Sequence, residues 1–181
     1  DWLSSLRLRA SYGVNGTLPT DNYGWRSLAS YNNQYGGEPG GALANAADAN
    51  LSWETSYTSN VALEFGFLDE RIKGSVEYFN RDSKDLLQDV PISYITGFSS
   101  TLKNVGEINN KGIEFELSGD IITNKDFRWS ASINGSHVKS EVTKLYGGQE
   151  IIWEDPTGGD ARATYIYREG ESTLALYGRE W

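Results

Sequence analysis

The 181-residue sequence contains no cysteine, no methionine and only one histidine. Without cysteine there is no disulfide framework, and one histidine cannot build a Cys/His zinc site from this chain alone. Lysine and arginine number 16 against 25 aspartates and glutamates, a net charge of −9, which disfavours nucleic acid as a partner. No apolar run approaches the roughly 18 residues of a transmembrane helix, and no signal peptide is recognisable.

Aromatic residues and glycine are abundant instead. Aromatics make up 13% of the chain and there are 20 glycines. Helical periodicity is scarce, and its best candidate, the alanine-rich stretch 42–50, is too short to organise a domain. A polar chain rich in Tyr, Trp, Gly, Ser and Asn is typical of all-β proteins with long loops, and its length suggests one domain.

Five segments alternate apolar and polar residues with the period of a β-strand, at 6–12, 57–67, 72–81, 112–118 and 127–136. Since successive side chains point to opposite faces, each predicted strand has one uncharged and one charged face. The charged positions are Arg7, Arg9, Glu64, Lys73, Glu77, Arg81, Glu114, Glu116 and Arg128. A soluble sandwich and a membrane barrel both produce this alternation, so the pattern alone leaves the two open.

The predicted connectors alternate strictly between short and long. Segments 68–71 and 119–126 are short, whereas 13–56, 82–109 and 137–164 are long and contain all four prolines. Short periplasmic turns and long extracellular loops are typical of outer-membrane barrels. With the long loops outside, the uncharged faces place aromatics at both ends of the strands. The predicted lipid-facing girdles are Tyr12, Tyr57 and Tyr78 at the outer end, and Phe67, Phe127 and Trp129 at the inner end.

Five or six strands cannot close a barrel, because the smallest membrane barrels have 8. The missing methionine and the absence of a recognisable start or stop signal agree with a piece of a longer chain. We therefore favour an antiparallel transmembrane β-barrel segment with long extracellular loops. The alternative is a soluble secreted β-sandwich that acts as a carbohydrate-binding module.

The segment NVGEINNKGIEFELSG (Asn104–Gly119) closely resembles the NxGxxxNKGxE signature of SusC/RagA-like TonB-dependent outer-membrane transporters. Segments 6–16, 51–92, 127–134 and 168–181 have counterparts in the same order. The resemblance implies a 22-stranded barrel with an N-terminal plug, in the outer membrane of Bacteroidota-type bacteria. Residues 1–181 would then be part of the barrel domain, with the plug and the TonB box outside this chain. We expect the ending at Trp181 to be a truncation.

The family resemblance also implies partners: the TonB complex through the missing part, a SusD-like surface lipoprotein as a lid, and imported glycans or peptides. No cofactor is implied. The predicted lumen-facing residues are Arg9, Glu64, Glu77, Phe79, Arg81, Glu114, Glu116 and Arg128. The candidate substrate or lid contacts are the connector aromatics Tyr23, Trp25, Tyr31, Tyr35 and Tyr94, because binding residues concentrate in loops. Packing of loops against one another is an equally open role for these rings.

Catalytic and metal sites have little support. Any Ser–His–Asp arrangement must use His137, for which we expect a structural role near the membrane interface. Glu114 and Glu116 lie about 7 Å apart by strand geometry and could mark a glycosidase, but a charged barrel interior accounts for them more simply. The acids of the stretch 154–160 do not match an EF-hand, so calcium binding there stays open. We predict no enzymatic activity.

Overall fold

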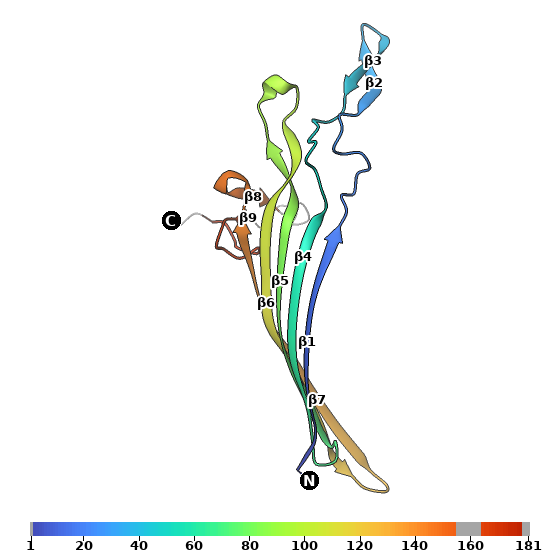
Figure 1. Cartoon of the computed structure of the whole chain (residues 1–181), viewed down its shortest axis with the longest axis vertical. Helices are drawn as coiled ribbons and strands as arrows, with labels where there is room; N and C mark the ends of the chain where they lie inside the picture. Colours follow the sequence, from blue (N-terminus) through green and yellow to red (C-terminus); the bar gives the residue numbers. More distant parts are fainter. Residues whose placement is uncertain (1, 155–163, 179–181) are drawn as a thin grey trace.

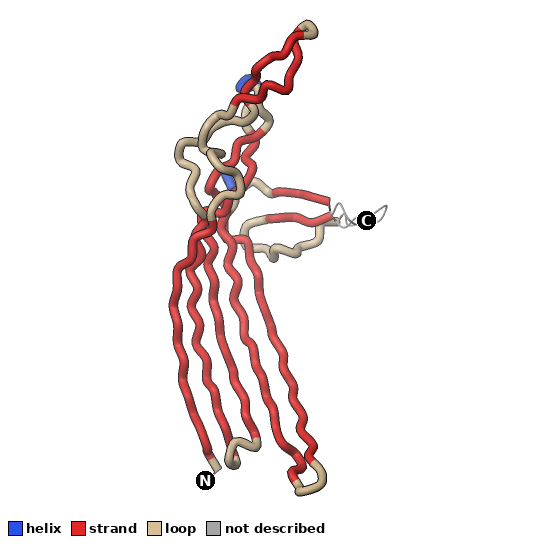
Figure 2. Tube along the Cα trace, turned by 90° about the vertical axis from the view of Figure 1, so that its right-hand side faces the viewer, coloured by secondary structure: helices blue, strands red, loops and turns tan. Residues whose placement is uncertain are grey.

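The computed structural model describes residues 2–154 and 164–178. Five long strands form one antiparallel sheet in the order β1-β4-β5-β6-β7 (Figures 1 and 2). They are β1 (Leu3–Thr17), β4 (Glu54–Phe67), β5 (Ile72–Pro91), β6 (Ser100–Thr123) and β7 (Arg128–Lys144). Two small hairpins, β2 (Ala29–Tyr35) with β3 (Glu38–Leu43) and β8 (Ile151–Glu154) with β9 (Thr164–Tyr167), stand apart from this sheet. The short 3-10 turns η1 (Tyr94–Thr96) and η2 (Tyr146–Gly148) complete the described elements.

The register aligns the apolar positions of the five predicted strands on one face of the sheet. One row of direct partners runs Leu8, Leu63, Val76, Phe115 and Gly135, and the next row on the opposite face runs Arg7, Glu64, Ser75, Glu116 and Asn134. The sheet therefore has an apolar face, which carries the first row, and a charged face, which carries the second. The prediction of an all-β antiparallel sheet with segregated faces is confirmed.

The strands extend much further than the alternation predicted. The expected connector 82–109 is mostly a continuation of β5 and β6, whose ladder runs out to the pair Pro91 and Ser100. Likewise the expected loop 13–56 contains the β2–β3 hairpin, and β7 continues to Lys144 inside the expected loop 137–164. Alternation fails in these parts because polar and apolar residues no longer separate onto opposite faces there, although the strands remain paired.

Two prolines expected in loops lie in strands. Pro39 belongs to β3 of an isolated two-stranded ribbon, and Pro91 is the last residue of β5. Proline lacks the N–H that a central strand must donate, so sheets tolerate it at strand ends and edges. The other two, Pro19 and Pro156, fall in a connector and outside the described residues, respectively.

Register shifts interrupt the β5–β6 and β6–β7 ladders at one level, and in the β5–β6 ladder a second shift, between Leu86 and Leu87, restores the register. β5 is bulged between Ser83 and Leu86, where Asp85 has a left-handed backbone (φ 57°), and the β6–β7 ladder shifts between Glu107 and Ile108. Because Ser83 pairs with Ile108, both irregularities lie at the same level of the sheet. Below them the ladder is regular from Ile72 to Ser83 on β5.

Burial is sparse for a sheet of this size. The buried apolar residues in the described part are Ala62, Val90, Val142, Leu145 and Ile166. The apolar face is open, with Leu6, Leu8 and Ile133 exposed by 61%, 72% and 59%. A sandwich would require a second sheet on this face, and none covers it within the described residues. No helix in the described part is long and apolar enough to span a membrane.

Candidate functional site

Aromatic rings lie at both ends of the apolar face. Tyr12, Tyr57 and Tyr78 share this face at the outer end, as the register shows. At the inner end Phe67 stacks on Trp2, with ring centroids 5.7 Å apart and planes inclined by 13°, and Phe65 lies 5.3 Å from Phe67. Sequence reasoning missed Trp2, because it lies outside the alternating segment.

The other two predicted inner aromatics occupy different surroundings. Trp129 pairs with Ile122 of β6 just beyond a bulge between Asp120 and Ile122. Phe127 lies before the start of β7, in the turn, where its carbonyl accepts a hydrogen bond from the Asn124 N–H at 2.8 Å. The predicted strand start at Phe127 is therefore one residue early.

Ion pairs cross the charged face between β1, β4 and β5. Arg9 donates to Glu77 at 2.9 Å and lies 3.4 Å from Glu64, which is also 3.6 Å from Arg7. Side chains on neighbouring strands are close enough for such pairs, each of which contributes about 0.2–1 kcal/mol. The expected cross-strand ladder is thus present over these three strands.

The charge pattern changes at β6. Glu114 faces Glu77 directly in the register, and neither Glu114 nor Glu116 has an ion-pair partner among the described residues. Arg81, opposite Thr58 and Asn110, also makes no ion pair within this part of the chain. At the inner end of the face, Arg128 pairs with Asp120 at 2.7 Å. β6 therefore presents unneutralised carboxylates to whatever lies against the charged face.

Three phenylalanines each lie directly opposite a glycine. The register pairs are Phe65 with Gly74, Phe79 with Gly112, and Phe115 with Gly135. A Cβ built on Gly74 would lie 2.5 Å from the Phe65 ring, one on Gly112 would lie 3.0 Å from the Phe79 ring, and one on Gly135 would lie 2.7 Å from the Phe115 ring. Each ring therefore occupies the space that a side chain on the neighbouring strand would fill.

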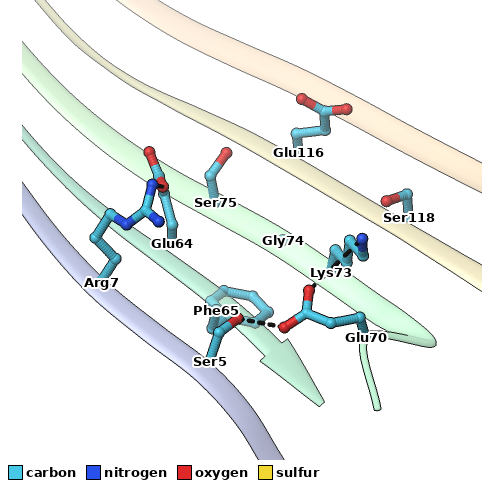
Figure 3. A pocket seen from close by; sticks show the side chains of 10 residues that line it. All are labelled: Ser5, Arg7, Glu64, Phe65, Glu70, Lys73, Gly74, Ser75, Glu116 and Ser118. Carbon is cyan, nitrogen blue, oxygen red and sulfur yellow. Dashed lines mark hydrogen bonds and ion pairs between the residues drawn. The ribbon is translucent and has the colours of Figure 1, made fainter. Parts of the chain in front are cut away.

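The inner end of the charged face contains a polar recess of about 390 Å³ (Figure 3). There the Glu70 carboxylate folds back over the sheet, accepts a hydrogen bond from the Ser5 hydroxyl at 2.6 Å and lies 3.6 Å from the Lys73 ammonium. Glu70 lies in the turn between β4 and β5, where three consecutive residues, Leu68, Asp69 and Glu70, have left-handed backbones. Its N–H is satisfied by the Ser4 hydroxyl at 3.2 Å, so β1 holds this strained turn in place.

Asn104 of the signature segment makes hydrogen bonds to the outer connector. The Asn104 amide oxygen accepts from the Ser52 N–H at 2.8 Å, and its NH₂ donates to the Ser52 carbonyl at 2.9 Å and the Asp85 carbonyl at 2.8 Å. Asn104 therefore joins the connector before β4 to the bulge of β5. Within the same segment a Cβ on Gly106 would lie 3.2 Å from Leu86, and Gly112 lies under Phe79.

The five connector aromatics do not form one site. Tyr31 and Tyr35 belong to β2, Tyr94 lies in η1, and the β2–β3 hairpin and the β5–β6 tip are separate projections (Figure 1). Tyr31 packs on its own hairpin, 3.1 Å from the Cβ position of Gly41, while Arg26 lies over the Trp25 ring at 4.5 Å. The side chain of Tyr35 lies outside what the structure describes.

Tyr23 and Tyr94 lie at separate places. Tyr23 has a left-handed backbone with φ 64°. At the tip of the β5–β6 hairpin, Tyr94 and its neighbour Ile95 are exposed by 82% and 98%. Sequence reasoning missed Ile95, whose exposure only the hairpin geometry reveals.

The remaining polar candidates have ordinary surroundings. His137 lies on the apolar face opposite Ile113. Beyond the strands, a hydrogen bond from Arg168 lowers the pKa of the Glu150 carboxyl. In the described part no group of three or more His, Cys, Asp or Glu residues could hold a metal ion. The acidic stretch 155–160 and the ending at Trp181 lie outside the described residues, and so does the side chain of Glu154.

Comparison with known proteins gives concordant matches. The family described as "TonB dependent receptor-like, beta-barrel" matches residues 1–170. TonB-dependent receptor P3 of Formosa agariphila is 35% identical over 99% of this chain and 18% of its own length. TonB-dependent receptor SusC of Bacteroides thetaiotaomicron is 36% identical over 82% of this chain and 16% of its own length. The chain thus spans less than a fifth of these relatives.

Solved structures agree with the sequence relatives. A chain of the RagAB peptide transporter superposes with a TM-score of 0.80 and 35% identity, covering 94% of this chain and 18% of that one. The RagAB peptide importer in its "open-open" state matches with a TM-score of 0.78 and 36% identity over 93% of this chain and 18% of that one. TonB-dependent receptors are transporters rather than enzymes, in agreement with the predicted lack of enzymatic activity. The chain belongs to the TonB-dependent receptor β-barrel family and is SusC/RagA-like.

Proposed function

We propose that this chain forms part of the barrel wall of a transporter that imports oligosaccharide or peptide nutrients across the bacterial outer membrane. The barrels of its family are outer-membrane proteins. In this proposal the apolar face contacts lipid and the charged face lines the lumen. The girdles are Tyr12, Tyr57 and Tyr78 outside, with Phe67, Phe127 and Trp129 inside. The lumen residues are Arg9, Glu64, Glu77, Phe79, Arg81, Glu114, Glu116 and Arg128.

The segregation of the two faces carries this proposal. Soluble monomers rarely expose contiguous apolar patches beyond a few hundred Å², yet here the whole inner part of one face is apolar and open across five strands. A bilayer removes that surface from water, and a polar interior accommodates the opposite face. Both edge strands, β1 and β7, would pair with neighbouring strands of the complete barrel, since free edge groups cost several kcal/mol each in lipid.

The partners follow from the relatives. Similarity to the RagAB peptide transporter and to the TonB-dependent receptor SusC supports a SusD-like lipoprotein lid and a peptide or glycan cargo for this chain. Energy would come from the TonB complex through parts of the receptor other than this wall. In this proposal a lid and a substrate approach the end of the sheet that carries the β2–β3 hairpin and the β5–β6 tip (Figure 1). Tyr31 and Tyr35 belong to β2, Tyr94 to η1, and Tyr23 and Trp25 to the connector between β1 and β2.

Nitroxide labels on adjacent residues test the membrane orientation. Val76→Cys and Ser75→Cys place a label on the apolar and the charged face of β5, in a segment that has no native cysteine. In the full-length receptor in bilayers, we expect the Val76 label to be accessible to oxygen dissolved in lipid. The Ser75 label should be accessible to a water-soluble nickel complex instead.

The refuting result is equally specific. If both labels were protected from both reagents, the apolar face would pack against protein, as in a sandwich, and the barrel proposal would fail. Uptake is tested separately, by comparing cells with and without the full-length receptor for import of labelled oligosaccharides and oligopeptides. If cells without the receptor imported both classes as well as cells with it, the transport proposal would be refuted.

A further inference from the structure

The charged face becomes apolar at its outer end. Ile108 lies on the same face of β6 as Glu114, and its direct partner Val142 lies on the same face of β7 as Asn134. Val142 is only 2% exposed, because the chain beyond β7 folds over it. This stretch of the face therefore differs from the ion-paired stretch nearer the inner end.

A recess of about 450 Å³ opens at this place. Its wall is formed by Leu86, Leu87, Ile108, Val142, Leu145 and Ile151, from β5, β6, β7 and β8. Figure 2 shows the β8–β9 hairpin projecting from the sheet beside the outer end of β7. We call this cavity the outer recess.

The outer recess is unlike the rest of the charged face in its chemistry. Barrel interiors are normally polar, whereas the surface of this recess is mostly apolar. Its volume lies within the roughly 300–1,000 Å³ of small-molecule sites. The polar side chains that line it are the Glu107–Lys144 ion pair, with Nζ and Oε1 3.3 Å apart, and Gln88, Tyr167 and Thr173.

These features discriminate between the two cargo classes. A sugar ring is surrounded by hydroxyls, and hydroxyls buried against an aliphatic wall without hydrogen bonds cost free energy. An apolar amino-acid side chain loses no hydrogen bonds when it enters a recess with such a wall. The peptide backbone beside it has both N–H donors and carbonyl acceptors, and the half-buried Glu107 carboxylate and the exposed Lys144 ammonium complement one of each.

We propose that the outer recess binds an apolar side chain of an imported peptide and so selects among peptides at the mouth of the barrel. This inference rests on the proposed transport function and narrows its cargo to peptides with aliphatic or aromatic side chains. Leu87 contributes through its side chain, while its N–H is already bound to the Glu54 carboxylate at 3.0 Å. A change of the Leu87 side chain therefore leaves that backbone contact in place.

The test uses the purified full-length receptor and peptides of one length that differ at one position, Leu, Phe, Ala or Ser. We expect the Leu and Phe peptides to bind at least about tenfold more tightly than the Ala and Ser peptides, the usual discrimination of an apolar pocket. Leu87→Gln should abolish this preference, and Leu87→Met, which keeps an apolar side chain of similar volume, should retain it. Heat-modifiable migration on gels verifies that each variant is folded.

Photo-crosslinking locates the contact directly. A peptide with photo-leucine at the varied position should crosslink to the strands that form the recess. If peptides bind without side-chain preference, or crosslink elsewhere because another segment or the lid occupies the recess, the inference fails while transport stands. If the receptor binds and imports only oligosaccharides, the inference again fails alone. If it binds and imports nothing, the proposed function fails with it.

Discussion

Replacing Gly112 by alanine tests whether the glycine of the signature segment is required for space. A Cβ at this position would collide with the backbone carbonyl oxygen of His137 on β7 and lie 3.0 Å from two carbons of the Phe79 ring. A ring can rotate, but a carbonyl in the ladder cannot move without opening the strand pair. Overpacking of this kind costs about 1–3 kcal/mol.

The matched control is Gly13→Ala on β1. A Cβ there would meet no atom within 4 Å, and neither glycine has a left-handed backbone. At an unobstructed site, Gly→Ala stabilises by about 0.4–1 kcal/mol, because the unfolded chain loses freedom. We therefore expect Gly112→Ala to lower the free energy of unfolding by about 1–3 kcal/mol and Gly13→Ala to leave it equal or raise it.

Urea unfolding of the full-length receptor, followed by heat-modifiable gel migration, measures both variants. Combining Gly112→Ala with Phe79→Leu separates the two obstacles. The smaller side chain removes the ring contact and leaves the carbonyl contact, so only part of the loss should be recovered. Equal stabilities for the Gly112 and Gly13 variants would refute the steric account of this glycine.

Three further perturbations follow from the same geometry. Gly66→Ala should destabilise the receptor in urea less than Gly112→Ala, because its Cβ would meet only the Glu70 carboxylate and the Ser5 hydroxyl, at the ends of side chains that can rotate away, and an equal loss would contradict this. Asn104→Ala should make the connector before β4 more sensitive to limited proteolysis without altering heat-modifiability. The control Asn33→Ala, at an exposed residue, should change neither property, and equal cleavage rates of the two variants would refute the role of Asn104. Leu63→Arg should cost about 2–4 kcal/mol in bilayers, and Ser75→Arg on the opposite face much less; similar losses would argue against a lipid-facing Leu63.

The inner part of the sheet was predictable because one physical constraint acts on every second residue. Leu63 and Val76 must be apolar and Glu64 need not be, so period-two alternation predicts the strands and assigns their faces. The connected pairs of strands then follow from the short turns. Ion pairs between neighbouring strands are also predictable as a class, although the sequence does not determine that Arg9 pairs with Glu77.

The outer part could not be predicted in this way. Both sides of the β5–β6 hairpin beyond Ser83 are polar or locally covered, so the residues show no period although the ladder continues. The connector before β4 is held by contacts between residues far apart in sequence, such as Asn104 with Ser52. The outer recess likewise depends on Ile108 and Val142 meeting across strands, which no local pattern encodes.

The irregular stretch of the β5–β6 ladder leaves the register unchanged, because Ser83 pairs with Ile108 and Leu87 pairs with Asn104, four residues further along both strands. Below Ser83, inserting one residue would exchange the two faces of a strand, because side chains alternate with a period of two. The two strands contain equal numbers of residues in the irregular stretch, so a change of length there on one strand would shift the pairs toward the hairpin tip unless the other strand changed equally. The regular pairs from Ile72 to Ser83 would keep their register in either case, so length changes nearer the tip leave the two faces of the inner sheet unchanged.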